Sequence, residues 1–561
     1  MKNLRSFKQQ LGTAAVLAAV LALSACGGGG GGGSAATPTG TAAVQVTDAP
    51  SKDFDHVWVT ISELRFHTSN AVAANDPGWL KFPLATPITV DLAALTNGAL
   101  ASAFSGVTLP AGTYQQIRMI LVPDNANLAA SALAAGLTYN DQVNWTNSLG
   151  LPQVAPLEIP RPVEGIALNG SFTVAANTTL QLAVDFDIGH DVVRFLHNGN
   201  SAFTLKPNLQ YFDLSQVGAI NGAVATTSLC TTTTTGCAYN LVIKAEQLSA
   251  DGSHHVATRY TTTRPDGSFT LYPVRVPAGQ TSVNVDVLVR GRNMDTILVR
   301  NVPVTAGSTP STGATSIATL ASPLPLTIDT EFTANASAGI NPTGAWVNFY
   351  QTLPGTGEVP YEVRYRHVNP FTGVFTDPIP LSTGPVQLGS YVAGATPTLV
   401  STPVAQGNGN FLVYAGAPDY TRTAATSGTL MGTAGATPTF TLPATLSVNS
   451  AVATANSLSG TITQAVANTY DSGYLVVVRM GTIVDTIPLA SVLTANGGTG
   501  GSFSVGNLPG GSTASPLPSA YYYVYARVWN STAPATTTRR IDFSGYADLR
   551  TGNATGINAT L

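Results

Sequence analysis

The stretch TLQLAVDFD, residues 179–187, shows the side-chain pattern that decides the fold class of this chain. Leu, Leu, Val and Phe stand at every second position, and Gln, Ala and two Asp residues fill the other positions. The stretch SVNVDVLVR, residues 282–290, repeats the pattern with valine at every second position. Since successive side chains of a β-strand point to opposite faces, each stretch predicts a strand with one buried face and one wet face.

Strands of this kind, separated by turns rich in Gly, Pro and Asn, predict antiparallel sheets. We therefore expect an all-β protein of tandem antiparallel β-sandwich domains, with minor helix in the first domain. Short helices are expected within residues 92–104 and 126–137, where Ala and Leu cluster. Changes in composition divide the chain into sandwiches at residues 41–215, 216–306, 316–448 and 456–561. We expect the third to be immunoglobulin-like or similar, and the fourth to be related to the second.

Residues 1–25 have the pattern of a bacterial export signal. Basic residues precede an apolar run at 11–23, which is shorter than the roughly 20 residues of a membrane-spanning helix. The run ends in LSAC, which resembles a bacterial lipobox. We predict cleavage before Cys26 and attachment of lipid to that cysteine. The glycine-rich stretch from Cys26 to residue 40 would then form a flexible tether.

The residue after Cys26 bears on the location of the protein. In lipoproteins of bacteria with two membranes, an aspartate there favours the inner membrane, whereas this chain has Gly27. The resemblance therefore implies the outer membrane or cell surface. The chain has a net charge of −4 and no basic cluster, so a nucleic-acid partner is disfavoured. We expect contact with the membrane through the lipid, and with a polysaccharide or another envelope protein.

The other two cysteines, Cys230 and Cys237, flank a Thr-rich loop. In an oxidising compartment we expect them to form a disulfide. Paired cysteines also serve as metal ligands, but no second pair or nearby histidine completes such a site.

Residues 40–213 contain a series of short motifs. They are TDAP at 47–50, VWVTI at 57–61, VDL at 90–92, LPAGTY at 109–114, DFD at 185–187 and LKP at 205–207. Their order and spacing resemble a bacterial family of domains of unknown function, family 4382, which implies a domain but no activity. The glycines and DGSF signal of residues 218–305 resemble the carboxypeptidase regulatory-like domains, which implies a transthyretin-like sandwich. Starch-binding modules share this carbohydrate-binding-like fold, but that is an analogy of fold alone.

Three aspartates are candidate metal ligands. Asp185 and Asp187 stand two apart on one strand and therefore project from the same face. Asp48 stands at the end of another predicted strand, where it would reach a loop mouth. Calcium prefers several oxygen ligands, so these carboxylates could hold it, and no other cofactor is expected. The alternatives are an Asx-type turn at Asp48 and an exposed acidic face at the other two.

The run YYYVYARVW, residues 521–529, gathers aromatic side chains on one strand. One face would carry Tyr521, Tyr523, Tyr525, Arg527 and Trp529, and the residues between them would form core. Exposed rings beside a guanidinium would provide a platform for a sugar or a protein. The alternative is an interface between neighbouring domains, or a sheet covered on both faces.

The sequence contains no recognisable catalytic constellation. It has no HExxH, no G-x-S-x-G, and no Gly-rich loop followed by Lys and Ser or Thr. We therefore expect a lipid-anchored envelope protein, not an enzyme, that binds or spaces other components. A carbohydrate-binding protein that uses aromatic strand faces, and a metal-dependent protein centred on the three aspartates, are the alternative hypotheses.

Overall fold

The structure is a computed structural model that describes residues 37–561 apart from internal gaps. The gaps of four residues or more are 226–240, 324–330, 354–358, 381–384, 404–410, 429–438, 494–497 and 512–519. Cys26, Cys230 and Cys237 lie outside the described residues, so the lipid attachment and the disulfide stay predictions. Within the described part of the chain, no helix is long and apolar enough to cross a membrane.

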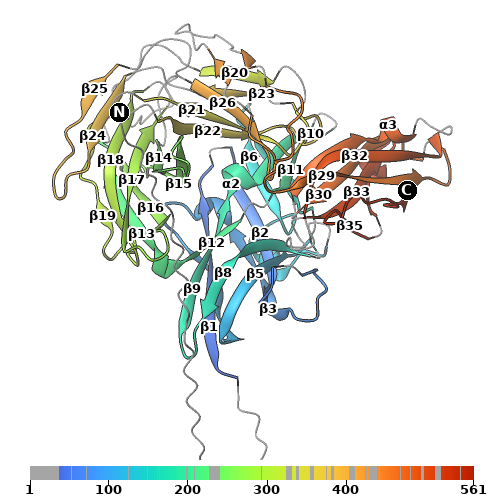
Figure 1. Ribbon diagram of the computed structural model, residues 1–561, viewed down its shortest axis with the longest axis horizontal. Helices are drawn as coiled ribbons and strands as arrows, with labels where there is room; N and C mark the ends of the chain where they lie inside the picture. Colours follow the sequence, from blue (N-terminus) through green and yellow to red (C-terminus); the bar gives the residue numbers. More distant parts are fainter. Residues whose placement is uncertain are drawn as a thin grey trace, which may run out of the picture.

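The predicted all-β class is confirmed, because packed sheets with only short helices make up the described chain (Figure 1). The alternation that predicted strands is seen in β9 (Thr179–Asp187) and β17 (Ser282–Arg290). Their buried alternate side chains are Leu182, Val184, Phe186, Val285, Val287 and Val289.

The first domain packs a four-stranded sheet against an eight-stranded sheet in the centre of the molecule (Figure 1). The smaller sheet has the order β12 (Gln210–Asp213), β9, β1 (Thr39–Ala49) and β4 (Ala101–Pro110). The larger has the order β10 (Val192–His197), β11 (Asn200–Leu205), β7 (Pro152–Glu158), β6 (Gln142–Thr146), β2 (His56–His67), β5 (Gly112–Leu121) and β8 (Ile166–Val174), and β3 (Leu80–Asp91) pairs with β2. Strands β1 and β9 run parallel, so their C-terminal ends lie side by side.

Helix in the first domain is shorter than expected. Residues 92–104 hold one 3-10 turn, η1 (Leu92–Ala94), and then enter β4. The prediction of a helix there is wrong because β4 pairs with β1, which buries Ala103 and Phe104 in the core. The other helical segments of this domain are α1 (Ala130–Ala134), which lies within the second expected helix, α2 (Ile188–Asp191) and η2 (Leu214–Gln216).

The second domain, green in Figure 1, is a sandwich of a three-stranded and a six-stranded sheet. The small sheet has the order β16 (Ser268–Arg275), β13 (Val217–Ala223) and β19 (Thr315–Ser316). The large sheet has the order β15 (His255–Thr262), β14 (Val242–Leu248), β17, β18 (Thr296–Thr305), β24 (Val386–Ser390) and β25 (Val400–Thr402). Composition assigns β24 and β25 to the third domain, but β24 pairs parallel with β18 and so extends the sheet of the second.

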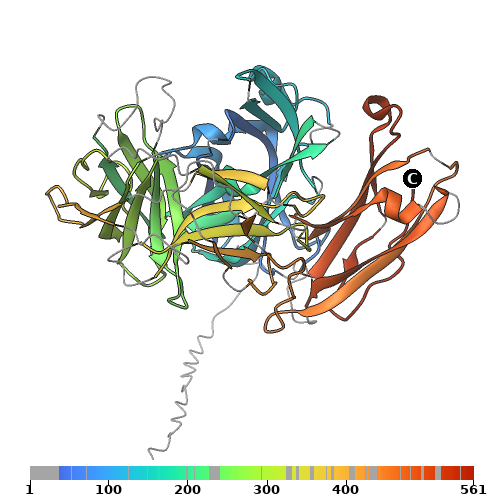
Figure 2. The ribbon, with the colours of Figure 1, turned by 90° about the horizontal axis from the view of Figure 1, so that it is seen from above.

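The third and fourth domains each pair two further sheets. One sheet of the third domain has the order β23 (Thr376–Pro380), β20 (Glu331–Ala336) and β28 (Thr439–Phe440). Its other sheet has the order β22 (Tyr361–His367), β21 (Trp346–Gln351), β26 (Phe411–Gly416) and β27 (Thr426–Gly428). One sheet of the fourth domain has the order β32 (Gly500–Gly510), β29 (Thr454–Thr463) and β36 (Ala559–Thr560). Its other sheet has the order β31 (Thr482–Pro488), β30 (Ser472–Arg479), β33 (Tyr521–Trp529) and β34 (Arg539–Asp542), and β35 (Ala547–Asp548) also pairs with β33. This domain also contains the short helices α3 (Leu489–Leu493) and α5 (Pro534–Thr537). Seen from above, the second and fourth domains flank the first and third (Figure 2).

Small apolar clusters lie between the domains, in addition to one core within each. Phe212 of the first domain packs with Tyr272 of the second. Leu288 and Leu298 of the second pack with Tyr361 of the third. The third cluster joins the third and fourth domains and contains Phe371, Val476, Val478, Ile483 and Tyr525. Because these contacts bury apolar surface between sandwiches, they favour one fixed arrangement of the four domains.

A substitution of Phe186 tests how much the core of the first domain contributes to stability. Phe186→Ala would leave a cavity in the core beneath β9, and a loss of about 3–5 kcal/mol in the unfolding free energy of the first domain is expected. Leu149→Ala is the control, because Leu149 is 80% exposed. Denaturant unfolding followed by circular dichroism measures both, and equal small changes would contradict the core assignment.

Candidate functional site

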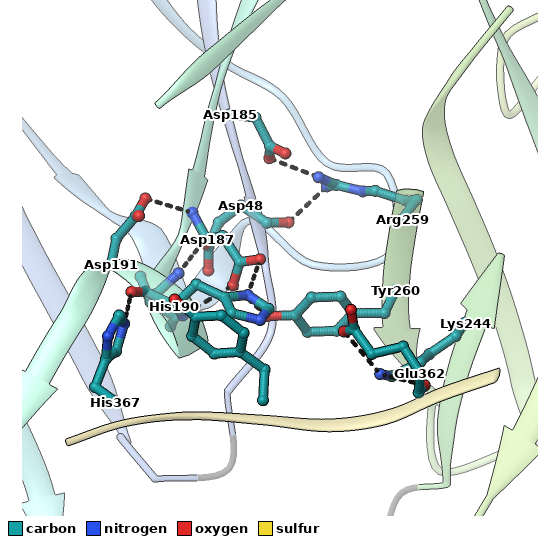
Figure 3. A network of polar contacts seen from close by, with 12 residues as sticks. Asp48, Asp185, Asp187, His190, Asp191, Lys244, Arg259, Tyr260, Glu362 and His367 are labelled. Carbon is teal, nitrogen blue, oxygen red and sulfur yellow. Dashed lines mark hydrogen bonds and ion pairs between the residues drawn. The ribbon is translucent and has the colours of Figure 1, made fainter. Parts of the chain in front are cut away.

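The three predicted aspartates meet at one end of the first domain, where the second and third domains contact it (Figure 3). Parallel pairing of β1 with β9 sets Thr47 opposite Asp185, and Ala49 opposite Asp187. The Asp48 side chain is fully buried, and its Oδ1 accepts the N–H of Ile188 at 2.9 Å. Its Oδ2 has no hydrogen-bond partner among the described residues. Burial therefore raises the pKa of Asp48 well above its usual value.

Arg259 enters this cluster from β15 of the second domain and is itself buried. Its guanidinium donates to Asp185 Oδ1 at 2.5 Å and to the backbone carbonyl of Asp48 at 2.6 Å. Burial raises the pKa of Asp185 even though the charge of Arg259 lowers it. A buried guanidinium is costly unless it is paired and hydrogen-bonded, so this contact fixes how the second domain meets the first.

Asp187 is bound by two further side chains. The hydroxyl of Tyr260, which follows Arg259 on β15, donates to Asp187 Oδ1, and His190 of α2 contacts Asp187 Oδ2. Burial would raise the pKa of Asp187, but the charge and hydrogen bond of His190 outweigh it and lower that pKa. Burial alone would lower the pKa of His190, and pairing with Asp187 raises it instead. The pair is therefore an ionised bridge inside the cluster.

The third domain contacts the same region through His367 of β22 (Figure 3). His367 Nε2 donates to the backbone carbonyl of His190, and its Nδ1 lies 3.2 Å from the ammonium of Lys206. Lys206 also donates to the Gly344 carbonyl at 2.8 Å and lies 5.3 Å from the centre of the Trp346 ring. Burial lowers the pKa of Lys206 to about 7. Lys206 is thus a buried link from the first domain to the third.

A second charged cluster joins the second and third domains. Lys244 Nζ of β14 lies 3.7 Å from Glu362 Oε1 of β22 and donates to the Glu362 carbonyl at 3.1 Å. Glu246, also on β14, accepts the N–H of Glu362 at 3.1 Å. Burial raises the pKa of Glu246 to about 8, so its carboxyl is largely protonated at neutral pH.

The geometry corrects the expectation of a calcium site. Among the described residues, no group of three or more His, Cys, Asp or Glu side chains is arranged to hold a metal ion. Oxygens of Asp48, Asp185 and Asp187 instead accept hydrogen bonds from Ile188, Arg259, His190 and Tyr260. The aspartates do come together, as their shared edge of the sheet suggested, but they bind protein donors from neighbouring elements.

The aromatic face of β33 is partly covered by the first domain. The Tyr525 hydroxyl donates to Glu158 Oε1 at 2.7 Å, and Arg527 pairs with the same carboxylate. Tyr525 and Trp529 are buried. The expectation of a fully exposed face therefore needs correction at these two rings. Tyr525 contacts the first domain, and Trp529 packs beside Tyr474 of β30.

Sequence reasoning missed Arg259, Tyr260, Lys206 and Glu158, which provide the contacts between domains. The low content of charged residues could have indicated these positions. Only 10% of the residues are charged, against about a quarter in an ordinary domain, so a charged side chain within a strand is unusual here. Arg259 has such a position, inside the strand segment HVATRYTT.

Comparison with known proteins finds a family model that matches most of the first domain, as its motifs predicted. Residues 39–207 match the family model "Domain of unknown function (DUF4382)". No curated protein matches the chain significantly. The resemblance of residues 218–305 to the carboxypeptidase regulatory-like domains stays a prediction.

Solved structures give only remote similarity. The TIE protein of Bacillus anthracis is 10% identical with a TM-score of 0.14, over 92% of this chain and 73% of that chain. A streptococcal ancillary pilin is 11% identical with a TM-score of 0.14, over 61% of this chain and 98% of that chain. At such TM-scores we infer nothing about activity or domain arrangement from either protein.

Substitutions of Asp48 test whether its buried carboxyl destabilises the folded protein. Asp48→Asn keeps the acceptor for Ile188 and removes a buried ionisable group, so it is expected to raise the melting temperature at neutral pH. Because the folded pKa of Asp48 is raised, its destabilising effect disappears as pH falls below its ordinary pKa of 3.8, and the advantage of Asn should disappear with it. Asp48→Ala leaves the Ile188 N–H without its acceptor and should cost about 1–3 kcal/mol. Calorimetry across pH checks this order, and an Asn variant as unstable as the Ala variant would contradict it.

Proposed function

We propose that the chain is a lipid-anchored protein of the bacterial cell envelope that displays four fixed sandwich domains and has no catalytic role. The observation that carries the proposal is the pairing of buried and half-buried charges across the domain contacts. Asp185 of the first domain binds Arg259 of the second, and Glu158 of the first binds Arg527 of the fourth. Each pair joins two domains, which suits a structural link between them.

The anchor part of the proposal rests on the N-terminal sequence. The basic start, the apolar run and LSAC precede Cys26, and the glycine tether follows it. After the tether, the chain enters β1 of the central first domain. An anchor at Cys26 would thus hold the domain to which the second, third and fourth all attach, at the outer membrane or cell surface. The partner would be a polysaccharide or another envelope protein.

Lipid attachment can be tested on the full chain in a bacterial host. Cys26→Ser should abolish incorporation of a labelled palmitate and release the protein from the membrane fraction, because the thiol that carries the lipid is lost. Cys230→Ser is the matched control and should keep both the label and the membrane fraction. Equal labelling of wild type and Cys26→Ser would overturn the anchor.

Carbohydrate binding is a second candidate, and a group of one exposed and two half-buried rings supports it. Tyr546, which is 42% exposed, packs against Tyr521 and Tyr523 with ring centres 5.6 and 6.2 Å away. The guanidinium of Arg550 lies 5.8 Å from the Tyr521 ring and is held by Asp548. Tilted aromatic faces beside fixed donors and acceptors suit the faces and hydroxyls of sugar rings.

The ring group can be tested by polysaccharide pull-down and a glycan array. The double variant Tyr521→Ala, Tyr546→Ala should lower retention on any polymer that retains the wild type, because it removes the exposed ring and a half-buried ring that packs against it. Tyr139→Ala, a half-buried tyrosine of the first domain, is the control. Retention that survives the double variant would remove this candidate, as would failure of the wild type to bind any polymer.

A further inference from the structure

Strand β22 contacts both neighbouring domains, and a histidine lies at each contact. At its start, the Tyr361 ring stacks on His255 of the second domain, with centres 3.9 Å apart and planes at 6°. At its end, His367 contacts His190 and Lys206 of the first domain. We call these two contacts together the β22 seam. Lys244, Glu246 and Glu362 lie between them.

The contacts of His367 require a neutral imidazole. Its Nε2 donates to a carbonyl, so its Nδ1 must accept from the Lys206 ammonium. A proton on Nδ1 would replace this hydrogen bond with two facing cations. The charged groups around His367 are Lys206, His190 and Arg366, which are basic, and Asp191, which acts through Lys206. Burial and the charge of Lys206 therefore lower the pKa of His367 well below its usual value.

His255 is also held neutral at the other end of the seam. Its Nδ1 is buried without a hydrogen-bond partner among the described residues, so a proton there would have no acceptor. Asp286 lies 3.7 Å from its Nε2 and favours the charged form, whereas Arg300 and His254 oppose it. Burial is the largest effect, and the pKa of His255 is lowered. Tyr361 stacks on the ring and donates to Asp286 at 2.6 Å.

We infer that the β22 seam is an acid-sensitive joint: mild acidification detaches β22 from the first and second domains and loosens the third domain. The inference goes beyond the proposed function and does not depend on the anchor or on any ligand. The proposed response is a conformational change, and its cause is that neutral histidines in the seam contact basic neighbours.

The direction of the pH response follows from the pKa shifts of the titratable groups in the seam. His367 and His255 have lowered pKa values, so they stabilise the closed seam above the ordinary histidine pKa of 6.5 and withdraw that stability as pH falls. Glu246 has a raised pKa, and it favours closure as pH falls from about 8 towards 4.5. His190, whose pKa is raised, gives its full contribution below 6.5 and adds no further change. Lys206, whose pKa is lowered to about 7, is protonated in both states once the pH is well below 7 and adds little change there. Two histidines therefore act against one glutamate. Their uptake and the proton released by Glu246 nearly cancel at the ordinary histidine pKa of 6.5, and opening takes up close to one net proton about one pH unit lower.

The experiment is hydrogen exchange of the full chain, read by mass spectrometry between about pH 7 and about pH 5.5 after correction for the intrinsic exchange rate. Exchange of the amides of β22 and of residues 343–347 should depend little on pH around the ordinary histidine pKa of 6.5 and accelerate below it. The acceleration should approach roughly tenfold per pH unit at about pH 5.5, where opening takes up close to one net proton. Amides of β29, whose Leu458 and Ile462 lie in the core of the fourth domain, serve as the internal control and should not respond.

Two kinds of variant sharpen the test. Glu246→Gln removes the opposing group and keeps the acceptor for Glu362, so the acceleration should begin at higher pH and approach roughly a hundredfold per pH unit at about pH 5.5. His367→Gln replaces the titrating ring with a neutral donor and acceptor, and the slope should vanish. His56→Gln, at an exposed histidine of the first domain, should leave the wild-type slope.

The wild-type profile decides the inference even where a variant fails to fold. A β22 exchange rate that is independent of pH would overturn it. It would also be overturned if β29 accelerated in parallel, since that would indicate unfolding of the whole chain, or if His367→Gln kept the wild-type slope.

Discussion

The contact of Arg259 with the first domain is the interaction on which the arrangement of the molecule depends. Parallel strands β1 and β9 end together and leave polar groups at one edge, among them a side chain of Asp185 and a carbonyl of Asp48. A guanidinium from another domain satisfies both. Once Arg259 is in place, its neighbour Tyr260 reaches Asp187, and α2 is fixed where β22 of the third domain can contact it.

Contacts between the domains thus combine apolar area with a few buried charges. The apolar clusters supply the driving force, because burial of hydrophobic surface is roughly proportional to area and has no direction. The buried pairs act differently: an unmatched charge would be costly in any other arrangement, so they select one orientation among many of similar area. This division explains why a chain so poor in charged residues places several of them inside its interfaces.

The sequence predicted the strands better than their partners. Alternation in β9 and β17 depends on local chemistry, so the buried faces could be read directly. The helix expected at 92–104 failed because the pairing of β4 with β1 outweighed the helical preference of Ala and Leu. Asp185 and Asp187 were placed together because they share a strand face. Their partners could not be foreseen, because Arg259 and His367 come from other domains and no periodicity encodes which strand docks where.

The position of β1 has a mechanical consequence. This strand lies inside its sheet, parallel to β9 on one side and antiparallel to β4 on the other, and the docked second domain is bound near its far end. A pull on the chain before Thr39 would run along the strand axis. Both ladders of hydrogen bonds would then carry the load together in shear, instead of rupturing one at a time as at a peeled edge. Drag on the outer domains would therefore meet the geometry in which a β-sheet resists force best.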